Sequence, residues 1–247
     1  MFTTTGCLAT DPGDLSRDRL RNSVGRVNQQ RLAPAAVPTV AASAATTIRE
    51  AIFDGRYAPG ERLVESELSQ QMGVSRGPIR ESLAVLESEG IVVGIQRRGK
   101  FVVSFTPKSL AEIYSFRKVL DCAVSEFLIQ QMNDQVADRL ESAILEIGTA
   151  AAASDVRGVA TKDLEFHQLA YDLAGHELLS RAWQDGVWGR LKILVNLTTA
   201  SLESLKEAEI QHRLLIQPLL NRDVAEARKR IEEHIDEAHE RALKSLN

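Results

Sequence analysis

The spacing of apolar residues changes near Pro107, and this change constrains the fold more than any other feature of the chain. Beyond Ser109, apolar residues recur every three or four positions, as on amphipathic helices, and no segment alternates as a strand does. The helices predicted there cover residues 109–132, 134–153, 157–174, 177–198, 203–220 and 223–245. Helices with no sheet to cover can bury their apolar stripes only against one another. We therefore expect an antiparallel α-helical bundle over residues 109–245.

Two of these helices carry recognisable start signals. Ser109 followed by Glu112 predicts a capping box at the start of the first helix, and Asp223 with Glu226 is typical of the start of the last. The acids and bases that follow include pairs four residues apart, such as Glu226 with Arg230. We interpret this run as a solvated helix face.

Before Pro107 the pattern predicts short helices and then a pair of strands. The predicted helices cover about residues 39–53, 65–72 and 75–89. The last two are joined across a turn that contains Gly73, which is the arrangement of a helix-turn-helix. Ser75 is a favourable N-cap residue for the second of them.

The strands complete the N-terminal pattern. Apolar, β-branched runs at 91–93 and 100–104 flank a polar, glycine-bearing turn and predict a β-hairpin. A hairpin directly after the second helix of a helix-turn-helix is a wing. The chain is thus predicted to be mainly α, with a winged helix-turn-helix of three helices and a β-hairpin over residues 40–105. Residues 1–39 show no apolar periodicity and are predicted to be a disordered N-terminal extension.

The cysteine content and the length of the apolar stretches indicate the cellular compartment. Cys7 and Cys122 are the only cysteines, and they lack metal-ligand spacing, which fits a reducing environment. No apolar stretch approaches the roughly 18 residues of a membrane helix, and the N-terminus does not resemble a secretory signal. We expect a cytoplasmic protein with no membrane partner.

The formal net charge of −4 does not by itself favour a nucleic-acid partner, but the distribution of charge does. No acidic residue lies between Gly90 and Ala111, and Arg97, Arg98 and Lys100 lie close together in that stretch. The predicted wing therefore carries a local excess of positive charge, which indicates contact with an anionic partner.

The predicted helix 75–89 carries a second basic group. Arg76 and Arg80 lie one turn apart near its N-terminus, opposite the apolar stripe. That end of a recognition helix enters the major groove in helix-turn-helix proteins, and arginine can bind guanine O6 and N7 or a phosphate. Gly77 has no side chain, so the backbone there could approach DNA closely. The alternative is that these are solvated surface arginines; basic residues on both the helix and its wing favour DNA.

Four potential metal ligands lie on the inward faces of three predicted helices. Asp163 and His167 are one turn apart, and His212 and His234 each interrupt the apolar stripe of their helix. Burying four such groups separately is costly, whereas one divalent metal ion satisfies all of them. The alternative is that each is a separately satisfied core histidine; their convergence from three helices favours a metal. Zinc, nickel and manganese are the candidate ions.

A family resemblance supports the DNA interpretation. The segment from Leu68 to Leu83, LSQQMGVSRGPIRESL, is similar to the winged helix of the GntR family of bacterial repressors, as are PGERL before it and RRGKFVV after it. The resemblance covers residues 40–105 and implies DNA contact by Arg76 and Arg80, with close approach at Gly77 and Gly99. Ser66 stands where some relatives have a basic residue, so that contact is in doubt here.

A second resemblance covers residues 109–245, which are similar to the FCD effector domain of the fatty-acid-regulator-type GntR subfamily. The matching features are FRKVLD at residues 116–121, then Asp163-x3-His167, and then His212 followed by His234. The resemblance implies that this aspartate and these three histidines are metal ligands and that small organic acids are effectors.

The same resemblance assigns a role to Arg117, which matches an arginine that lines the effector pocket. We expect Arg117 to anchor the effector carboxylate; a structural salt bridge with Asp121 is the alternative. The two remaining bundle histidines are expected to lie outside the metal site, His176 as a helix cap and His239 as an exposed residue.

These features predict a DNA-binding transcriptional regulator, a repressor rather than an enzyme. It is expected to bind a palindromic double-stranded operator as a homodimer and to respond to a small carboxylic acid at a metal-centred pocket. One alternative is a metal-responsive regulator with no organic effector. A DNA-tethered metalloenzyme is less favoured, because no inward Glu, Lys or Cys accompanies the metal ligands to act as acid or base.

Overall fold

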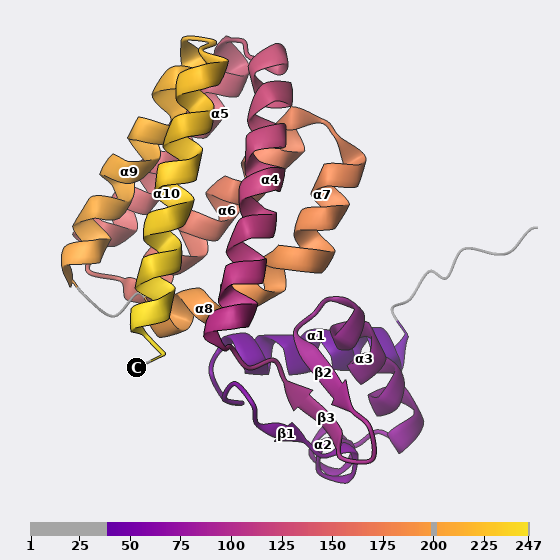
Figure 1. The fold of residues 1–247 in the computed structure, drawn as a ribbon. Helices are drawn as coiled ribbons and strands as arrows, with labels where there is room; N and C mark the ends of the chain where they lie inside the picture. The colour runs from indigo at the N-terminus through magenta and orange to yellow at the C-terminus, as the bar shows by residue number, and fades with distance from the viewer. Residues whose placement is uncertain (1–38, 199–201, 247) are drawn as a thin grey trace, which may run out of the picture. The chain divides into compact units, whose positions relative to one another are not determined.

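The computed structural model describes residues 39–198 and 202–246 (Figure 1). The predicted disordered extension, residues 1–39, lies outside the described residues except for Thr39, which caps the first helix. The described chain is mainly α, with one small sheet in its N-terminal third and helices thereafter, so the predicted fold class is confirmed. Within the described ranges, no helix is both long enough and apolar enough to cross a membrane.

The N-terminal elements form a winged helix-turn-helix. They are α1 (Val40–Phe53), β1 (Arg62–Leu63), α2 (Glu65–Met72), α3 (Arg76–Ser88), β2 (Val92–Ile95) and β3 (Gly99–Val102). Gly73 ends α2 with a left-handed φ of 65°, a conformation that costs glycine little. The buried stripe of α3 consists of Ile79, Leu83 and Leu86, each 0% exposed.

The predicted hairpin is present as β2 and β3, which pair antiparallel with Val92 opposite Val102 and Ile95 opposite Gly99. The sheet has a third strand that the sequence did not predict. Strand β1 pairs with β3 through Arg62 and Leu63 alone, giving the order β1-β3-β2. Two residues are too few to show an alternating pattern, so only the pairing identifies this strand.

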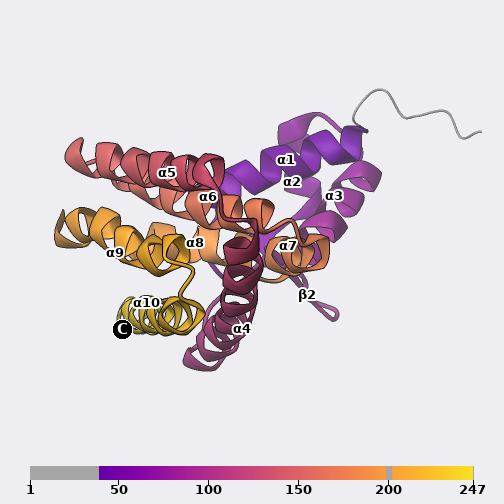
Figure 2. The ribbon, with the colours of Figure 1, turned by 90° about the horizontal axis from the view of Figure 1, so that it is seen from above.

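The helices beyond the wing form the predicted bundle (Figure 1). They are α4 (Pro107–Gln131), α5 (Asp134–Ala152), α6 (Val156–Ala174), α7 (Glu177–Trp183), the π-helix η1 (Gln184–Trp188), α8 (Gly189–Thr198), α9 (Leu202–Leu220) and α10 (Val224–Lys244). Helix α6 packs against α4, α5, α7, α8 and α9, while α10 packs against α4 and α9 (Figure 2). Side chains on the inner face of α6 therefore meet those of the surrounding helices.

The first bundle helix starts earlier than predicted. Its N-cap is Thr106, whose hydroxyl accepts a hydrogen bond from the Ser109 amide at 3.1 Å, and the Ser109 hydroxyl accepts from the Thr106 amide at 2.8 Å. The predicted capping box of Ser109 with Glu112 is therefore wrong. Pro107 at the first helical position explains the difference, because that position needs no amide hydrogen bond and suits the fixed φ of proline.

The predicted single helix over residues 177–198 is interrupted. Between α7 and α8, residues 184–188 form a π-helical turn. Gly186 lies in this turn, and a Cβ added there would lie 3.0 Å from the Phe116 ring of α4. The absence of a side chain at Gly186 thus allows close packing that the apolar spacing alone does not reveal.

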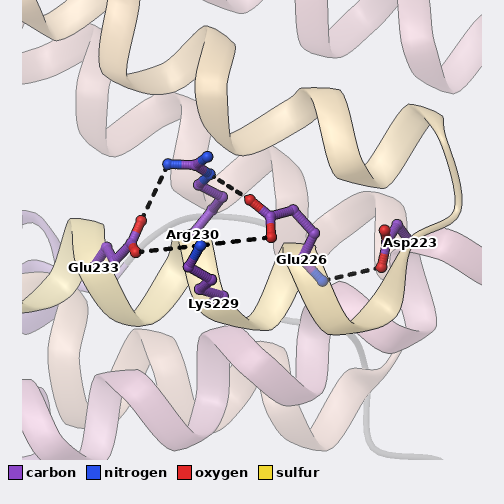
Figure 3. A network of polar contacts seen from close by, with 5 residues as sticks. All are labelled: Asp223, Glu226, Lys229, Arg230 and Glu233. Carbon is purple, nitrogen blue, oxygen red and sulfur yellow. Dashed lines mark hydrogen bonds and ion pairs between the residues drawn. The ribbon is translucent and has the colours of Figure 1, made fainter.

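The acid–base run on α10 forms the predicted solvated network (Figure 3). Arg230 donates to Glu226 at 2.8 Å and to Glu233 at 3.2 Å, and Lys229 bridges the same two carboxylates at 3.8 and 3.9 Å. Asp223 caps the helix by accepting from the Glu226 amide at 3.0 Å. These side chains are 37–59% exposed, so each pair contributes only a few tenths of a kcal/mol, roughly, to stability.

The bundle core can be tested with two leucines of α5. Leu140 is 0% exposed in the core, whereas Leu145 is 55% exposed on the same helix. We expect Leu140→Ala to lower the free energy of unfolding by about 2–5 kcal/mol, because it leaves a cavity. Leu145→Ala, the matched control, should cost less than about 1 kcal/mol, since it changes helix propensity equally but removes little packing. Urea denaturation measures both; equal losses would contradict this core.

Candidate metal centre and nucleic-acid interface

Three histidines from three helices meet inside the bundle. His167 of α6, His212 of α9 and His234 of α10 are 6%, 1% and 7% exposed. One nitrogen from each ring lies within 4.8 Å of one from each of the others, and the ring centroids are 5.3–5.6 Å apart. The structure therefore brings together the three imidazoles that the sequence placed on separate apolar stripes.

The fourth predicted ligand, Asp163, lies one turn before His167 on α6. It is partly exposed, and its Oδ1 lies 3.2 Å from Nε2 of His212. Asp163 therefore adjoins His212, while the group of ligand atoms that all lie within 4.8 Å of one another consists of the three imidazoles. Three ring nitrogens with a carboxylate nearby suit zinc, nickel or manganese.

The hydrogen bond of His212 determines which of its nitrogens is free. Nδ1 lies 2.7 Å from the Ala208 carbonyl oxygen, which can only accept, so Nδ1 carries the proton. In the neutral ring Nε2 then presents a lone pair toward the Asp163 carboxylate, which is itself an acceptor. Nε2 of His212 and Nδ1 of His234 are both buried without a hydrogen-bond partner among the described residues. A cation between these groups would satisfy acceptors that otherwise face one another.

Burial favours the neutral form of two of the three imidazoles, His167 and His234. Burial lowers the pKa of His167 well below its ordinary value, and the Arg117 charge lowers it further. Burial and then the neighbouring His212 lower the pKa of His234 in the same way. Metal ions bind these protonation states.

Arg117 of α4 contacts the cluster at His167. It is 4% exposed; its Nε donates to Asp121 Oδ2 at 3.1 Å and its Nη2 lies 2.7 Å from Nε2 of His167. Asp121 also accepts from the Tyr171 hydroxyl at 2.6 Å. The salt bridge considered from the sequence is therefore present, while contact of Arg117 with an effector stays a prediction.

Two cavities adjoin the histidines. One, of about 100 Å³, is lined by charged and polar side chains: Tyr114, Gln211, the cations Arg117 and Arg241, and the acids Asp163 and Glu207. The other, of about 50 Å³, is lined mainly by apolar groups such as Leu128, Leu140 and Phe166. Arg241 was not among the predicted site residues, although it follows His234 by seven residues and so lies two turns along the same face of α10. Nothing in the sequence distinguished Gln211.

Of the predictions for the other two histidines of the bundle, one is confirmed and one is wrong. His176 caps α7, since its Nδ1 accepts from the Leu179 amide at 3.3 Å, as predicted. The prediction that His239 is exposed is wrong: it is half-buried and stacks on the Tyr114 ring, with centroids 5.1 Å apart. Its position off the apolar stripe of α10 did not reveal this aromatic neighbour on α4.

The N-terminal end of α3 presents the predicted recognition residues to solvent. Arg76 is the first residue of α3, and both Arg76 and Arg80 are exposed. The Arg80 guanidinium donates to Glu65 of α2 at 2.6 Å. A Cβ added at Gly77 would meet no other group within 4 Å, so packing within the described residues does not require glycine there.

The wing places its basic residues at and beside the hairpin turn. Arg97 and Arg98 are exposed between β2 and β3, and Arg98 lies over the Phe101 ring at 5.8 Å. Gly99 has a left-handed φ of 106°, so the turn itself favours glycine there. The Lys100 ammonium pairs closely with Glu87 of α3, which lowers the pKa of that carboxyl. Lys100 is therefore less available to a partner than the two arginines.

Comparison with known proteins agrees with both parts of the chain. Residues 40–102 match the family described as "Bacterial regulatory proteins, gntR family", and residues 112–237 match the FCD domain. The HTH-type transcriptional regulator YdhC of Bacillus subtilis is 31% identical over 128 residues, which are 51% of this chain and 57% of that protein. The gluconate operon transcriptional repressor of the same organism is 25% identical over 203 residues, 78% of this chain and 81% of that repressor.

A solved structure extends the agreement to the fold. A putative GntR transcriptional regulator from Rhodococcus sp. RHA1 superposes with a TM-score of 0.71 at 23% identity, covering 83% of this chain and 97% of that one. With the FCD match alone spanning half of the sequence, the chain belongs to the GntR family of bacterial regulatory proteins and carries an FCD domain after its winged helix.

Proposed function

We propose that this chain is a transcriptional repressor that binds a palindromic operator as a homodimer and responds to a small carboxylic acid held at a divalent metal ion. The observation that carries the proposal is the pairing of two unlike sites in one chain. An exposed basic helix end faces solvent, and a buried histidine cluster lies within the bundle. Both curated relatives described above are named as transcriptional regulators, and the family consists of regulators rather than enzymes. The cytoplasm is the compartment in which we expect it to act.

The helix α3 supports DNA binding through three features. Arg76 lies at the helix N-terminus, where recognition helices contact base edges. Arg80 lies one turn further along, with its guanidinium oriented by Glu65. Gly77 between them leaves room for a phosphate backbone to approach. The wing adds Arg97 and Arg98 for a neighbouring groove or phosphates.

The DNA interface can be tested with matched arginine variants. We expect Arg76→Gln and Arg80→Gln each to weaken operator binding by about 1–3 kcal/mol, because each loses a bidentate base or phosphate contact. Fluorescence anisotropy with a duplex selected from a random pool measures the affinity. Arg213→Gln, a change at an exposed arginine of α9, is the control and should leave affinity unchanged. Equal affinity for all three variants and the parent would reject this face as the interface.

The metal centre supports the second part of the proposal. His167, His212, His234 and Asp163 would hold the ion, leaving coordination positions that a carboxylate could occupy. The bound ion would supply a fixed positive charge that attracts an anionic ligand into the cavity beside it. Arg117 and Arg241 line that cavity and add further positive charge. A cavity of about 100 Å³ fits a small acid rather than a long-chain one.

Metal binding predicts a specific loss in one histidine variant. We expect His212→Gln to lose most bound metal, because one nitrogen ligand and the partner of Asp163 disappear together. Elemental analysis of the purified protein measures the metal content. His176→Asn, which keeps a capping side chain outside the cluster, should retain it. Chelation should lower the melting temperature of the parent, since an ion at a hundredfold excess over its Kd adds about 2.7 kcal/mol of stability. Equal metal content in both variants would contradict the site.

The effector can be tested with a panel of small carboxylic acids. Gluconate belongs in the panel, because one relative is named for a gluconate operon. We expect one acid to bind the metal-loaded protein and to change operator affinity by about 5–150-fold, the usual range for coupled sites. Calorimetry gives the acid affinity, and anisotropy gives the operator affinity with and without saturating acid. An acid that binds without altering operator affinity would argue against control by the effector.

A second candidate function is a metal-responsive regulator with no organic effector. It is favoured by the same cluster, because three imidazoles and a carboxylate bind an ion without any acid. Operator affinity would then follow the concentration of free metal alone and would be unchanged by every acid in the panel.

A further inference from the structure

The contact between Arg117 and His167 has a consequence for the metal centre. Nη2 of Arg117 lies 2.7 Å from Nε2 of His167, and both side chains are buried. A guanidinium has donors only, so Nε2 of the imidazole must be the acceptor. The proton of the neutral ring then lies on Nδ1.

A neutral imidazole has one ring nitrogen with a free lone pair, because the other nitrogen carries the proton. Arg117 uses that lone pair through its hydrogen bond. A metal ion needs the same lone pair if it binds Nε2. If it binds Nδ1 instead, the ring must change tautomer, which again removes the acceptor from Arg117. The two interactions of His167 are therefore mutually exclusive, whichever nitrogen ligates.

We propose that Arg117 and the metal ion compete for His167, so that binding of the ion releases the Arg117 guanidinium for the carboxylate of the acid. This inference rests on the proposed metal site. Nε of Arg117 stays paired with Asp121, which Tyr171 holds in place, so the release affects the terminal amino group alone. Arg117 lines the same cavity as Asp163, His212 and His234, and the freed donor is thus already beside the ion.

The competition sets an order of binding. Before the ion binds, the Arg117 donor is engaged, and the acid lacks both the ion and this anchor. After the ion binds, both become available in the same cavity. Arg117 therefore weakens metal binding. It also makes acid binding depend on the metal more strongly than it would if the ion contributed only its own charge. The acid in turn should tighten metal binding, because it gives the displaced guanidinium a new partner.

The first experiment measures zinc affinity in a double variant of the full-length chain. Arg117→Met with Asp121→Asn removes the competing donor without leaving a buried carboxylate unpaired. Competition with a chromophoric chelator should show zinc bound roughly tenfold to a hundredfold more tightly than by the parent, the effect expected for losing a charge-assisted hydrogen bond. The single variant Asp121→Asn shows how much of the change in zinc affinity comes from the aspartate alone.

The matched control is Arg241→Gln, because Arg241 lines the same cavity and carries the same charge, and no hydrogen bond joins it to a histidine of the cluster in the described chain. If charge repulsion alone weakened the metal, this variant should gain affinity as much as the double variant does. Equal gains would overturn the competition, as would an unchanged or weaker zinc affinity in the double variant.

The second experiment needs no variant. Long-range ¹H–¹⁵N correlation of the chelator-treated parent should show His167 with its proton on Nδ1 and with Nε2 as a hydrogen-bonded acceptor. Zinc should remove that signature, and the double variant should lack it from the start. A His167 proton on Nε2 in the chelator-treated parent would reject the inference even if the variant does not fold.

Failure of the competition and failure of the metal centre would give different results. Zinc binding by the parent at the same strength as by the double variant rejects the competition and leaves the metal centre standing. Failure of both proteins to bind zinc, nickel or manganese rejects the metal centre, and the competition with it.

Discussion

The polar centre of the bundle depends on the burial of three imidazoles at the point where α6, α9 and α10 meet. Each ring has replaced an apolar side chain in an otherwise continuous stripe, so its polar atoms have lost water and need partners. One nitrogen of His212 is satisfied by the Ala208 carbonyl, and one nitrogen of His167 by Arg117. Nε2 of His212 and Nδ1 of His234 are then left buried without a hydrogen-bond partner among the described residues. That imbalance explains why we propose an ion as the partner for the site.

A second buried network joins α4 to this cluster. Tyr171 and Arg117 both contact Asp121, and Arg117 extends to His167. Trp183 supports it by stacking on the Tyr171 ring, with centroids 4.8 Å apart. The network includes a cation, a carboxylate and a neutral ring, so each polar group is satisfied by an opposite or complementary one. Arg117 is therefore one link between the histidine cluster and α4, the helix that follows directly from the wing in sequence.

The proposed DNA face differs from the cluster, because its charges lie on the surface. Arg80 and Lys100 are paired with Glu65 and Glu87, so their side chains are oriented but must exchange a carboxylate for a phosphate or base on binding. Arg76 is exposed at the helix end and makes no ion pair within the described residues. This division suggests unequal roles within one interface: some arginines are held in position, and others are free to adapt.

The sequence alone determined most of the helices and the hairpin, the winged helix-turn-helix over residues 40–105, and the placing of three histidines and an aspartate on inward helix faces. Those properties depend on neighbours within about two helical turns, which the spacing of residues records directly. Tertiary structure decided the rest. Strand β1 exists because β3 lies beside it, and the π-turn at Gly186 fits the ring of Phe116. Arg117 meets His167 across 50 residues of chain. A helical stripe specifies the face that is buried, but the rotation and axial position of each helix, and therefore which polar atoms touch, depend on how all the helices pack together.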